Sequence, residues 1–102
     1  TQTVRGNPRA VAYQMAKTAL TVFTKSLAQA EAERGIRVNM VNPGFIRTYA
    51  YTRAEIADAA RRIPAGRMGE PKDVAETVAW LASDAATYVN GAVVDVGGGL
   101  WV

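Results

Sequence analysis

The chain has 102 residues, of which 49% are hydrophobic and 21% are charged, and its formal net charge is +3. This length allows one domain at most, or part of one, and the composition is that of an ordinary globular core. Because the chain contains neither Cys nor His, it can form no disulfide, no zinc–thiolate site, no Ser-His-Asp triad and no imidazole acid–base pair. We expect no metal site, and proton transfer would have to use Asp, Glu, Lys or Tyr.

Charge and apolar runs exclude further classes. The Lys and Arg residues are scattered, with Arg61-Arg62 as the longest like-charge cluster, so nothing predicts binding to nucleic acid. No apolar run approaches the ~18–20 residues that span a bilayer, and no signal peptide opens the chain. We therefore expect a soluble, cytoplasmic protein without a membrane partner. The first residue, Thr1, suggests a cut end, because no initiator Met precedes it.

The first element that the sequence predicts is a long helix. Residues 1–9 include Gly6 and Pro8 and are typical of a loop. Residues 10–34 contain no Gly or Pro, and their apolar side chains recur at helical spacing, which predicts a helix that ends at Gly35 in a left-handed cap. Further apolar side chains widen the stripe beyond one face, so we expect this helix to be covered on two sides.

A strand and a loop follow the helix. Residues 36–41 are β-branched and alternate in polarity, which predicts a strand. Asn42-Pro43-Gly44 should end this strand. Residues 45–52 show no clear period and are predicted to form a loop.

Two shorter helices come next. Thr52 can cap a helix over residues 53–62, with Glu55 completing a capping box. Residues 63–66 contain Pro and Gly and break that helix. Pro71 then stands in the first turn of another predicted helix. Ser83-Asp84 ends this helix.

The last element is a strand, and the order of elements indicates the fold class. Residues 92–96 predict this strand, and Gly97-Gly98-Gly99 follows it. Two strands separated by about fifty residues and two helices form an α/β crossover pattern. A doubly wound sheet of this kind has about six strands, so two strands cannot cover these helices. The composition is that of a core whose other half is absent.

Tyr13 and Lys17 are the first candidates for chemistry. They stand four residues apart near the start of the long helix, so they share one face. A neighbouring ammonium and the positive end of a helix both favour a phenolate, which can act as an acid or a base. The same spacing also occurs by chance, as plain packing with a snorkelling Lys. The spacing alone therefore leaves both readings open.

Five motifs around this pair resemble those of one family. In chain order they are YQMAKTAL at 13–20, RGIRVN at 34–39, NPGFIRT at 42–48, PAGRMGEP at 64–71, and LASD at 81–84 with its Asn-Gly and Gly-Gly ending. Together they resemble the short-chain dehydrogenase/reductase family, and most closely the branch of β-ketoacyl-carrier-protein reductases and carbonyl reductases. The resemblance covers nearly the whole chain. It implies an α/β fold, with residues 1–102 as the C-terminal segment of a single Rossmann-type doubly wound parallel sheet.

The resemblance implies roles for the helix pair. Tyr13 would give a proton to the carbonyl oxygen during reduction, or take it from the alcohol during oxidation. Lys17 would bind the ribose hydroxyls of the nicotinamide nucleotide and favour the phenolate of Tyr13. The cofactor would be NAD or NADP, and the substrate a small-molecule carbonyl or alcohol.

The resemblance also implies roles for the loop after the first strand. Pro43 and Gly44 would let the chain pass close to the nicotinamide ring, the backbone of Ile46 would hold the carboxamide, and the side chain of Thr48 would add a contact. Residues 45–63 would form a mobile substrate lid. A plain turn, a core contact for Ile46 and a solvated hydroxyl for Thr48 are the structural alternatives.

Parts of the family pattern are not in this chain. The Gly-rich nucleotide loop and the catalytic Ser precede the Tyr helix in the family, so we expect the N-terminal dinucleotide-binding half to be missing. Thr1 or Thr3 would be weak substitutes for the Ser. Gly97-Gly98-Gly99 opens no helix and is not a phosphate loop. The selector between NADH and NADPH is not in the sequence.

The sequence also predicts an oligomer and leaves two rival functions open. The family resemblance and the wide apolar stripe predict a homodimer or homotetramer, with residues 10–34 in one interface and 92–102 near another. One rival is a catalytically silent fragment or subunit that serves as an assembly surface. The other is a basic binding module, which salt-sensitive DNA binding would reveal.

Overall fold

Between residues 8 and 100, the part that this computed structural model describes, the chain forms two short strands and three α-helices. The elements, in chain order, are α1 (Val11–Glu31), the 3₁₀ turn η2 (Ala32–Arg34), β1 (Met40–Pro43), α2 (Arg53–Arg62), α3 (Pro71–Ala82), the 3₁₀ turn η3 (Asp84–Ala86) and β2 (Val93–Val96). The predicted order of helix, strand, helix, helix and strand is confirmed. The loop predicted over residues 1–9 lies mostly outside the described residues.

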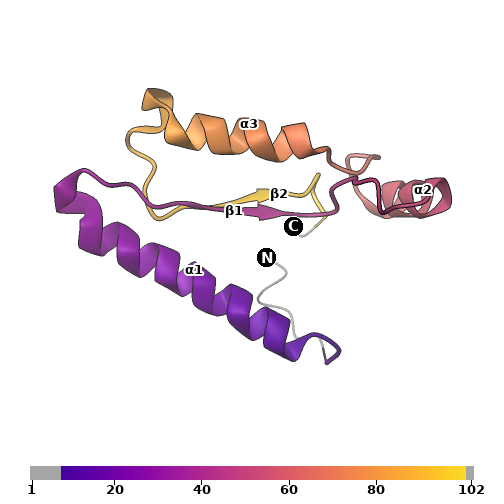
Figure 1. Cartoon of the computed structure of the whole chain (residues 1–102), viewed down its shortest axis with the longest axis horizontal. Helices are drawn as coiled ribbons and strands as arrows, with labels where there is room; N and C mark the ends of the chain where they lie inside the picture. Colours follow the sequence, from indigo (N-terminus) through magenta and orange to yellow (C-terminus); the bar gives the residue numbers. More distant parts are fainter. Residues whose placement is uncertain (1–7, 101–102) are drawn as a thin grey trace.

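The two strands are parallel, and helices flank them. β1 pairs with β2 in register from Met40 opposite Val93 to Pro43 opposite Val96. Parallel neighbours need a crossover connection, and α2 and α3 lie within it. Figure 1 shows α3 on one side of the strands and α1 on the other. The α/β class is therefore confirmed, as a two-stranded parallel sheet with helices on both sides.

The first strand begins later than predicted, at Met40 instead of residue 36. The preceding residues are held by side chains. The Val38 N–H donates to Asn90 Oδ1 at 2.9 Å, and Asn39 Oδ1 accepts the Ala92 N–H at 2.9 Å. Residues 36–39 therefore run beside the turn that leads into β2 and form no regular ladder with it.

The strand also ends later than predicted, because Asn42 and Pro43 belong to it. The Gly44 N–H donates to Val96 O at 3.0 Å. Backbone groups in a strand alternate in direction, so position 43 faces away from β2. The missing N–H of Pro43 thus breaks no bond to β2, which is how sheets tolerate proline.

Helix ends follow the predicted chemistry. Gly35 has a φ of 74° and its N–H donates to Ala32 O, as a left-handed cap requires. Thr52 and Glu55 form the predicted capping box: the Glu55 N–H donates to Thr52 Oγ1 at 3.2 Å, and the Thr52 N–H donates to Glu55 Oε2 at 2.8 Å. Pro71 is the first residue of α3. These local signals depend on near neighbours only, which is why they could be predicted.

The long helix is not covered on two sides, contrary to the prediction. Within α1 only Thr24 and Ala28 are buried. The exposed large apolar side chains of α1 are Val11, Tyr13, Met15, Leu20, Val22 and Phe23. The reason is that two strands offer α1 too little surface. The radius of gyration, 15.4 Å, exceeds the ~13 Å of a compact chain of about 100 residues.

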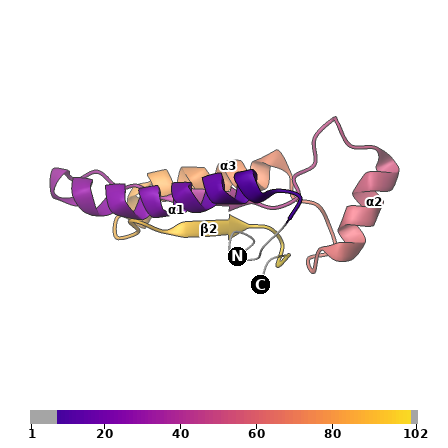
Figure 2. The same cartoon turned by 90° about the horizontal axis from the view of Figure 1, so that it is seen from below.

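The main buried cluster lies around α2, away from α1. It consists of Ala59, Ile63 and Met68, with Phe45, Ile56 and Leu100 packed against it. Figure 2 shows α2 standing at the end of the molecule, across the direction of α1 and α3. No helix within residues 8–100 has both the length and the apolar character needed to cross a membrane.

Candidate active site

Tyr13 and Lys17 lie on one face of α1, as their spacing predicts. Tyr13 is in the first turn, and Lys17 Nζ lies 5.6 Å from the centre of its ring. The Tyr13 residue is 61% exposed, so its hydroxyl is accessible from solvent. No side chain caps the start of α1 at Ala10, so the positive end of the helix dipole acts beside the phenol. Two positive charges therefore lie near Tyr13: the fixed positive end of the α1 dipole and the mobile ammonium group of Lys17.

The loop that leaves β1 carries the other predicted site residues. Gly44 is bonded to the end of β2, and Thr48 is exposed, with its hydroxyl accepting the Ala50 N–H at 3.4 Å. In open α/β sheets, ligands bind beyond the carboxyl ends of the strands. This loop starts at that position.

The helix pair and the loop lie toward the same end of the molecule but do not touch. Figure 1 shows the first turns of α1 on the side to which the strands point. Within residues 8–100, no hydrogen bond or ion pair joins Tyr13 or Lys17 to Pro43, Gly44, Ile46 or Thr48. Thr1 and Thr3 lie outside the described residues.

Ile46 has a more definite position than the sequence suggested. It forms a parallel bridge with Gly69: the Gly69 N–H donates to Phe45 O at 2.9 Å, and the Arg47 N–H donates to Gly69 O at 2.7 Å. These bonds use the neighbours of Ile46, so the N–H and C=O of Ile46 itself point to the opposite side. A Cβ on Gly69 would lie 2.7 Å from Ile46 Cδ1. A side chain at position 69 would therefore require Cδ1 of Ile46 to move.

Arg67 and Asp73 form an ion pair that the sequence analysis missed. Nη1 of Arg67 lies 2.8 Å from Oδ2 of Asp73, and Nη2 lies 3.2 Å from Oδ1. The hydrogen bond from Arg67 and the one from the Glu70 backbone lower the pKa of Asp73 to about 2, and the Asp73 carboxylate raises the pKa of Arg67. In the sequence, Arg67 stands six residues before Asp73, with a Gly and a Pro between them. That spacing could have suggested an ion pair, but only the turn brings the two side chains together.

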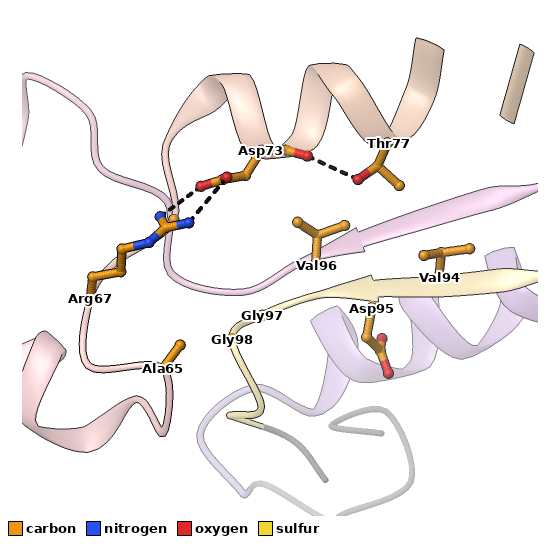
Figure 3. A pocket seen from close by; sticks show the side chains of 10 residues that line it. Ala65, Arg67, Asp73, Thr77, Val94, Asp95, Val96, Gly97 and Gly98 are labelled. Carbon is orange, nitrogen blue, oxygen red and sulfur yellow. Dashed lines mark hydrogen bonds and ion pairs between the residues drawn. The ribbon is translucent and has the colours of Figure 1, made fainter. Parts of the chain in front are cut away.

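This ion pair borders a pocket of about 340 Å³ between α3 and the end of β2. Figure 3 shows Val94 and Val96 pointing from β2 toward α3, while Asp95 points to the other side of the strand. The Thr77 hydroxyl donates to Asp73 O and holds the first turn of α3. Asp95 Oδ1 accepts the Asn42 Nδ2–H at 2.7 Å. Asp95, which also lines the pocket, thus turns its side chain away from Val94 and Val96 and toward Asn42.

Arg37 is a second residue whose position the sequence did not reveal. Its guanidinium donates to Leu81 O at 2.7 Å, Val89 O at 3.3 Å and Ser83 O at 3.4 Å. These carbonyls lie at the end of α3 and in the connection to β2. The Arg thus stabilises the end of α3 and takes no part in the site. Among residues 8–100, no group of three His, Cys, Asp or Glu side chains is arranged to hold a metal ion.

Known proteins are similar to this chain in sequence. The family model described as enoyl-(acyl carrier protein) reductase matches residues 1–101. The chain is 47% identical over 100 residues to a 3-oxoacyl-[acyl-carrier-protein] reductase of Haemophilus influenzae, and 45% identical over 101 residues to that of Escherichia coli. Each alignment covers 95% of this chain and 41% of the relative.

A solved structure shows the same arrangement of elements. The structure of acetoin dehydrogenase YohF from Salmonella typhimurium superposes with a TM-score of 0.83 at 38% identity, covering 96% of this chain and 38% of that protein. The chain thus spans about two fifths of the length of the relatives it matches. From these matches together, the chain belongs to the short-chain dehydrogenase/reductase family, in the branch of the 3-oxoacyl-acyl-carrier-protein reductases.

Proposed function

We propose that this chain is the C-terminal part of an NAD(P)-dependent oxidoreductase that reduces a carbonyl group or oxidises the corresponding alcohol. The single observation that carries the proposal is the placement of Lys17 Nζ 5.6 Å from the ring of an accessible Tyr13 at the start of α1. The names of the relatives, a 3-oxoacyl reductase and an acetoin dehydrogenase, both refer to a carbonyl or an alcohol. They support a small-molecule substrate of this class.

Tyr13 is the proposed acid–base group. In reduction, its hydroxyl gives a proton to the carbonyl oxygen, and in oxidation its phenolate takes the proton from the alcohol. When bound, NAD(P)H would supply the hydride for the carbonyl carbon. Lys17 would bind the ribose hydroxyls and stabilise the phenolate that forms when Tyr13 gives up its proton. A proton from solvent would then restore the Tyr13 hydroxyl after the product leaves.

The magnitude of the Lys17 effect depends on what covers the pair. Two unit charges about 5 Å apart interact by about 0.8 kcal/mol in water and about 3 kcal/mol at an effective dielectric of ~20. Because Tyr13 is 61% exposed here, the lower figure applies to the described residues alone. A covering nucleotide-binding half would raise the interaction toward the higher figure, so the proposed chemistry needs that half.

The loop after β1 fits a nicotinamide group. A carboxamide has both a donor and an acceptor, and the N–H and C=O of Ile46, which point away from Gly69, match them. Pro43 and Gly44 place no long side chain between this backbone and the ring. Thr48 is accessible for a further contact. We infer that Pro43, Gly44, Ile46, Thr48, Tyr13 and Lys17 are the cofactor-binding residues that this chain contributes.

The proposed partners are the N-terminal half and further copies of the enzyme. Large apolar side chains of α1 between Val11 and Phe23 are exposed, and exposed apolar patches favour association. We propose a homodimer or homotetramer. The same exposed side chains favour the rival function, in which the chain is a catalytically silent assembly surface.

An activity measurement separates the two functions. These 102 residues are joined to the nucleotide-binding half of the Escherichia coli relative to give the complete enzyme. Oxidation of NADPH and of NADH is then followed with acetoin and with a 3-oxoacyl thioester. Turnover that falls sharply in Tyr13→Phe supports the oxidoreductase. A well-folded complete enzyme without turnover supports the assembly surface.

A further inference from the structure

The turn after β2 packs directly on the chain that leaves α2. Gly98 and Gly99 have φ values of +61° and +84°, and the Leu100 N–H donates to Gly97 O at 3.1 Å. Positive φ at both central positions is typical of a type I′ turn and favours glycine. Neither the predicted chemistry nor the predicted cofactor contacts use this segment.

Nearby atoms also limit which residues can stand at positions 98 and 99. Gly98 O accepts the Ala65 N–H at 2.9 Å. A Cβ on Gly98 would lie 2.9 Å from Ile63 Cγ2 and 3.1 Å from Ala65 Cβ. A Cβ on Gly99 would lie 3.2 Å from Pro64 Cβ. The turn therefore lies against three consecutive residues at the end of α2.

Leu100 adds an apolar contact to the same place. It packs against the cluster of Ala59, Ile63 and Met68, whose exposed fractions are 5%, 4% and 4%. Figure 1 shows α2 beyond the ends of the strands, apart from α1. The apolar side of α2 is thus buried by this cluster and by Leu100, in the turn of residues 97–100.

The segment from residue 45 to residue 63 is held at both ends. At its start, Phe45 O accepts the Gly69 N–H. Just past its end, Ala65 donates to Gly98. The first attachment leads to Gly69, just before α3, and the second to the turn after β2, so these two contacts together determine where α2 stands.

We propose that residues 97–100 act as a clasp that holds the lid, residues 45–63, against the end of the sheet. Gly98 and Leu100 are positioning residues: Gly98 allows the close approach to Ile63, and Leu100 anchors α2 by packing. The role of the segment as a substrate lid rests on the proposed function. The attachment itself rests on the contacts above.

The test is amide hydrogen exchange, measured by mass spectrometry on the complete enzyme. Gly98→Ala should speed exchange in residues 53–66 by about tenfold or more, while α1 and β1 change little, because local opening needs only the clasp to release. Gly35→Ala is the matched control, since Gly35 has a similar φ of +74° but no atom within 4 Å of its added Cβ. It should leave the exchange of residues 53–66 unchanged.

Two more variants keep the test decisive if Gly98→Ala folds poorly. Leu100→Ala removes packing without adding a clash and should also speed exchange in α2. Ile63→Leu removes the Cγ2 atom that the new Cβ would meet, so it should partly restore protection in Gly98→Ala. Exchange that rises evenly over the chain, or no more than in Gly35→Ala, would overturn the clasp.

A kinetic measurement separates the clasp from the proposed function. A loosened lid should raise the KM of the carbonyl substrate several-fold, with a smaller effect on kcat, because binding energy orders the lid. Faster exchange in α2 with an unchanged KM would overturn the lid role of the segment. Wild-type enzyme without any turnover would contradict the proposed function, and the exchange pattern would still decide the clasp.

Discussion

Arg67 holds Asp73 through two hydrogen bonds, 2.8 and 3.2 Å long, and thereby joins the turn before α3 to the first turn of that helix. The same carboxylate accepts the Glu70 N–H at 2.8 Å. The Asp73 carboxylate thus accepts hydrogen bonds both from the Arg67 guanidinium and from a backbone N–H at the start of α3.

The first prediction follows from this pair. The pKa of Asp73 is lowered from 3.8 to about 2 by the Arg67 hydrogen bond and the Glu70 backbone. A lowered folded-state pKa stabilises the protein above the unfolded pKa, and the stabilisation disappears as the pH falls toward 2. In urea unfolding of the complete enzyme, Asp73→Asn should be less stable than wild type at pH 7, and the difference should shrink below about pH 4. Glu76→Gln on the same helix is the control, and an equal pH dependence in both variants would contradict the assignment.

The second prediction concerns the proposed acid–base group. Tyr13→Phe in the complete enzyme should lower kcat by at least ~10²-fold, because it removes the proposed proton donor, and should weaken cofactor binding far less, because the other cofactor-binding residues remain. Steady-state kinetics and a nucleotide titration measure the two effects. Tyr88→Phe, at another exposed tyrosine, should have no effect. A Tyr13→Phe variant that retains most of its turnover would rule out the role.

The third prediction concerns Lys17. Lys17→Ala should weaken nucleotide binding and lower turnover together, since the ammonium is proposed both to bind the ribose and to stabilise the phenolate. Lys25→Ala, an exposed lysine two turns further along α1, serves as the matched control. Unchanged nucleotide affinity in Lys17→Ala would count against the ribose contact.

The fourth prediction tests the approach of Gly69 to Ile46. Gly69→Ala would place a Cβ 2.7 Å from Ile46 Cδ1. Because this methyl group is the end of a flexible side chain, the loss of stability should lie at the low end of the about 1–3 kcal/mol that overpacking costs. Ile46→Val removes Cδ1, so the double variant should recover much of the lost stability. Thermal unfolding of the two single variants and the double variant gives the coupling. Additive losses would show that the contact is not the cause.

The fifth prediction concerns the 102-residue chain expressed by itself. It should show no cooperative unfolding, because α1 buries only Thr24 and Ala28 and exposes most of its large apolar side chains. Further large apolar side chains are exposed outside α1. Leaving about ten such side chains in water over residues 8–100 forgoes roughly 1.5–3 kcal/mol each, which exceeds the usual net stability of ~5–15 kcal/mol. Calorimetry measures this, and a sharp transition would indicate a self-sufficient domain and favour the assembly-surface function.

Local chemistry made much of the fold predictable from the sequence. The Gly35 cap, the Thr52–Glu55 capping box and Pro71 at the start of α3 depend on residues within one or two turns of each other. The order of elements followed from their periodicity, and the motifs around Tyr13 and Lys17 identified the family. The shared face of that pair followed from helix geometry alone.

Long-range contacts decided the rest. The first strand starts at Met40 because the side chains of Asn39 and Asn90 take up backbone groups more than fifty residues away in the chain. The Ile46–Gly69 bridge, the Arg67–Asp73 pair and the contact of Gly98 with Ile63 each join segments that only folding brings together. A sequence pattern records which residues are near in the chain, whereas these distances depend on the direction of the turns between them. The sequence by itself therefore determined the elements and the family, and the tertiary structure decided where α2 stands and which distant residues contact it.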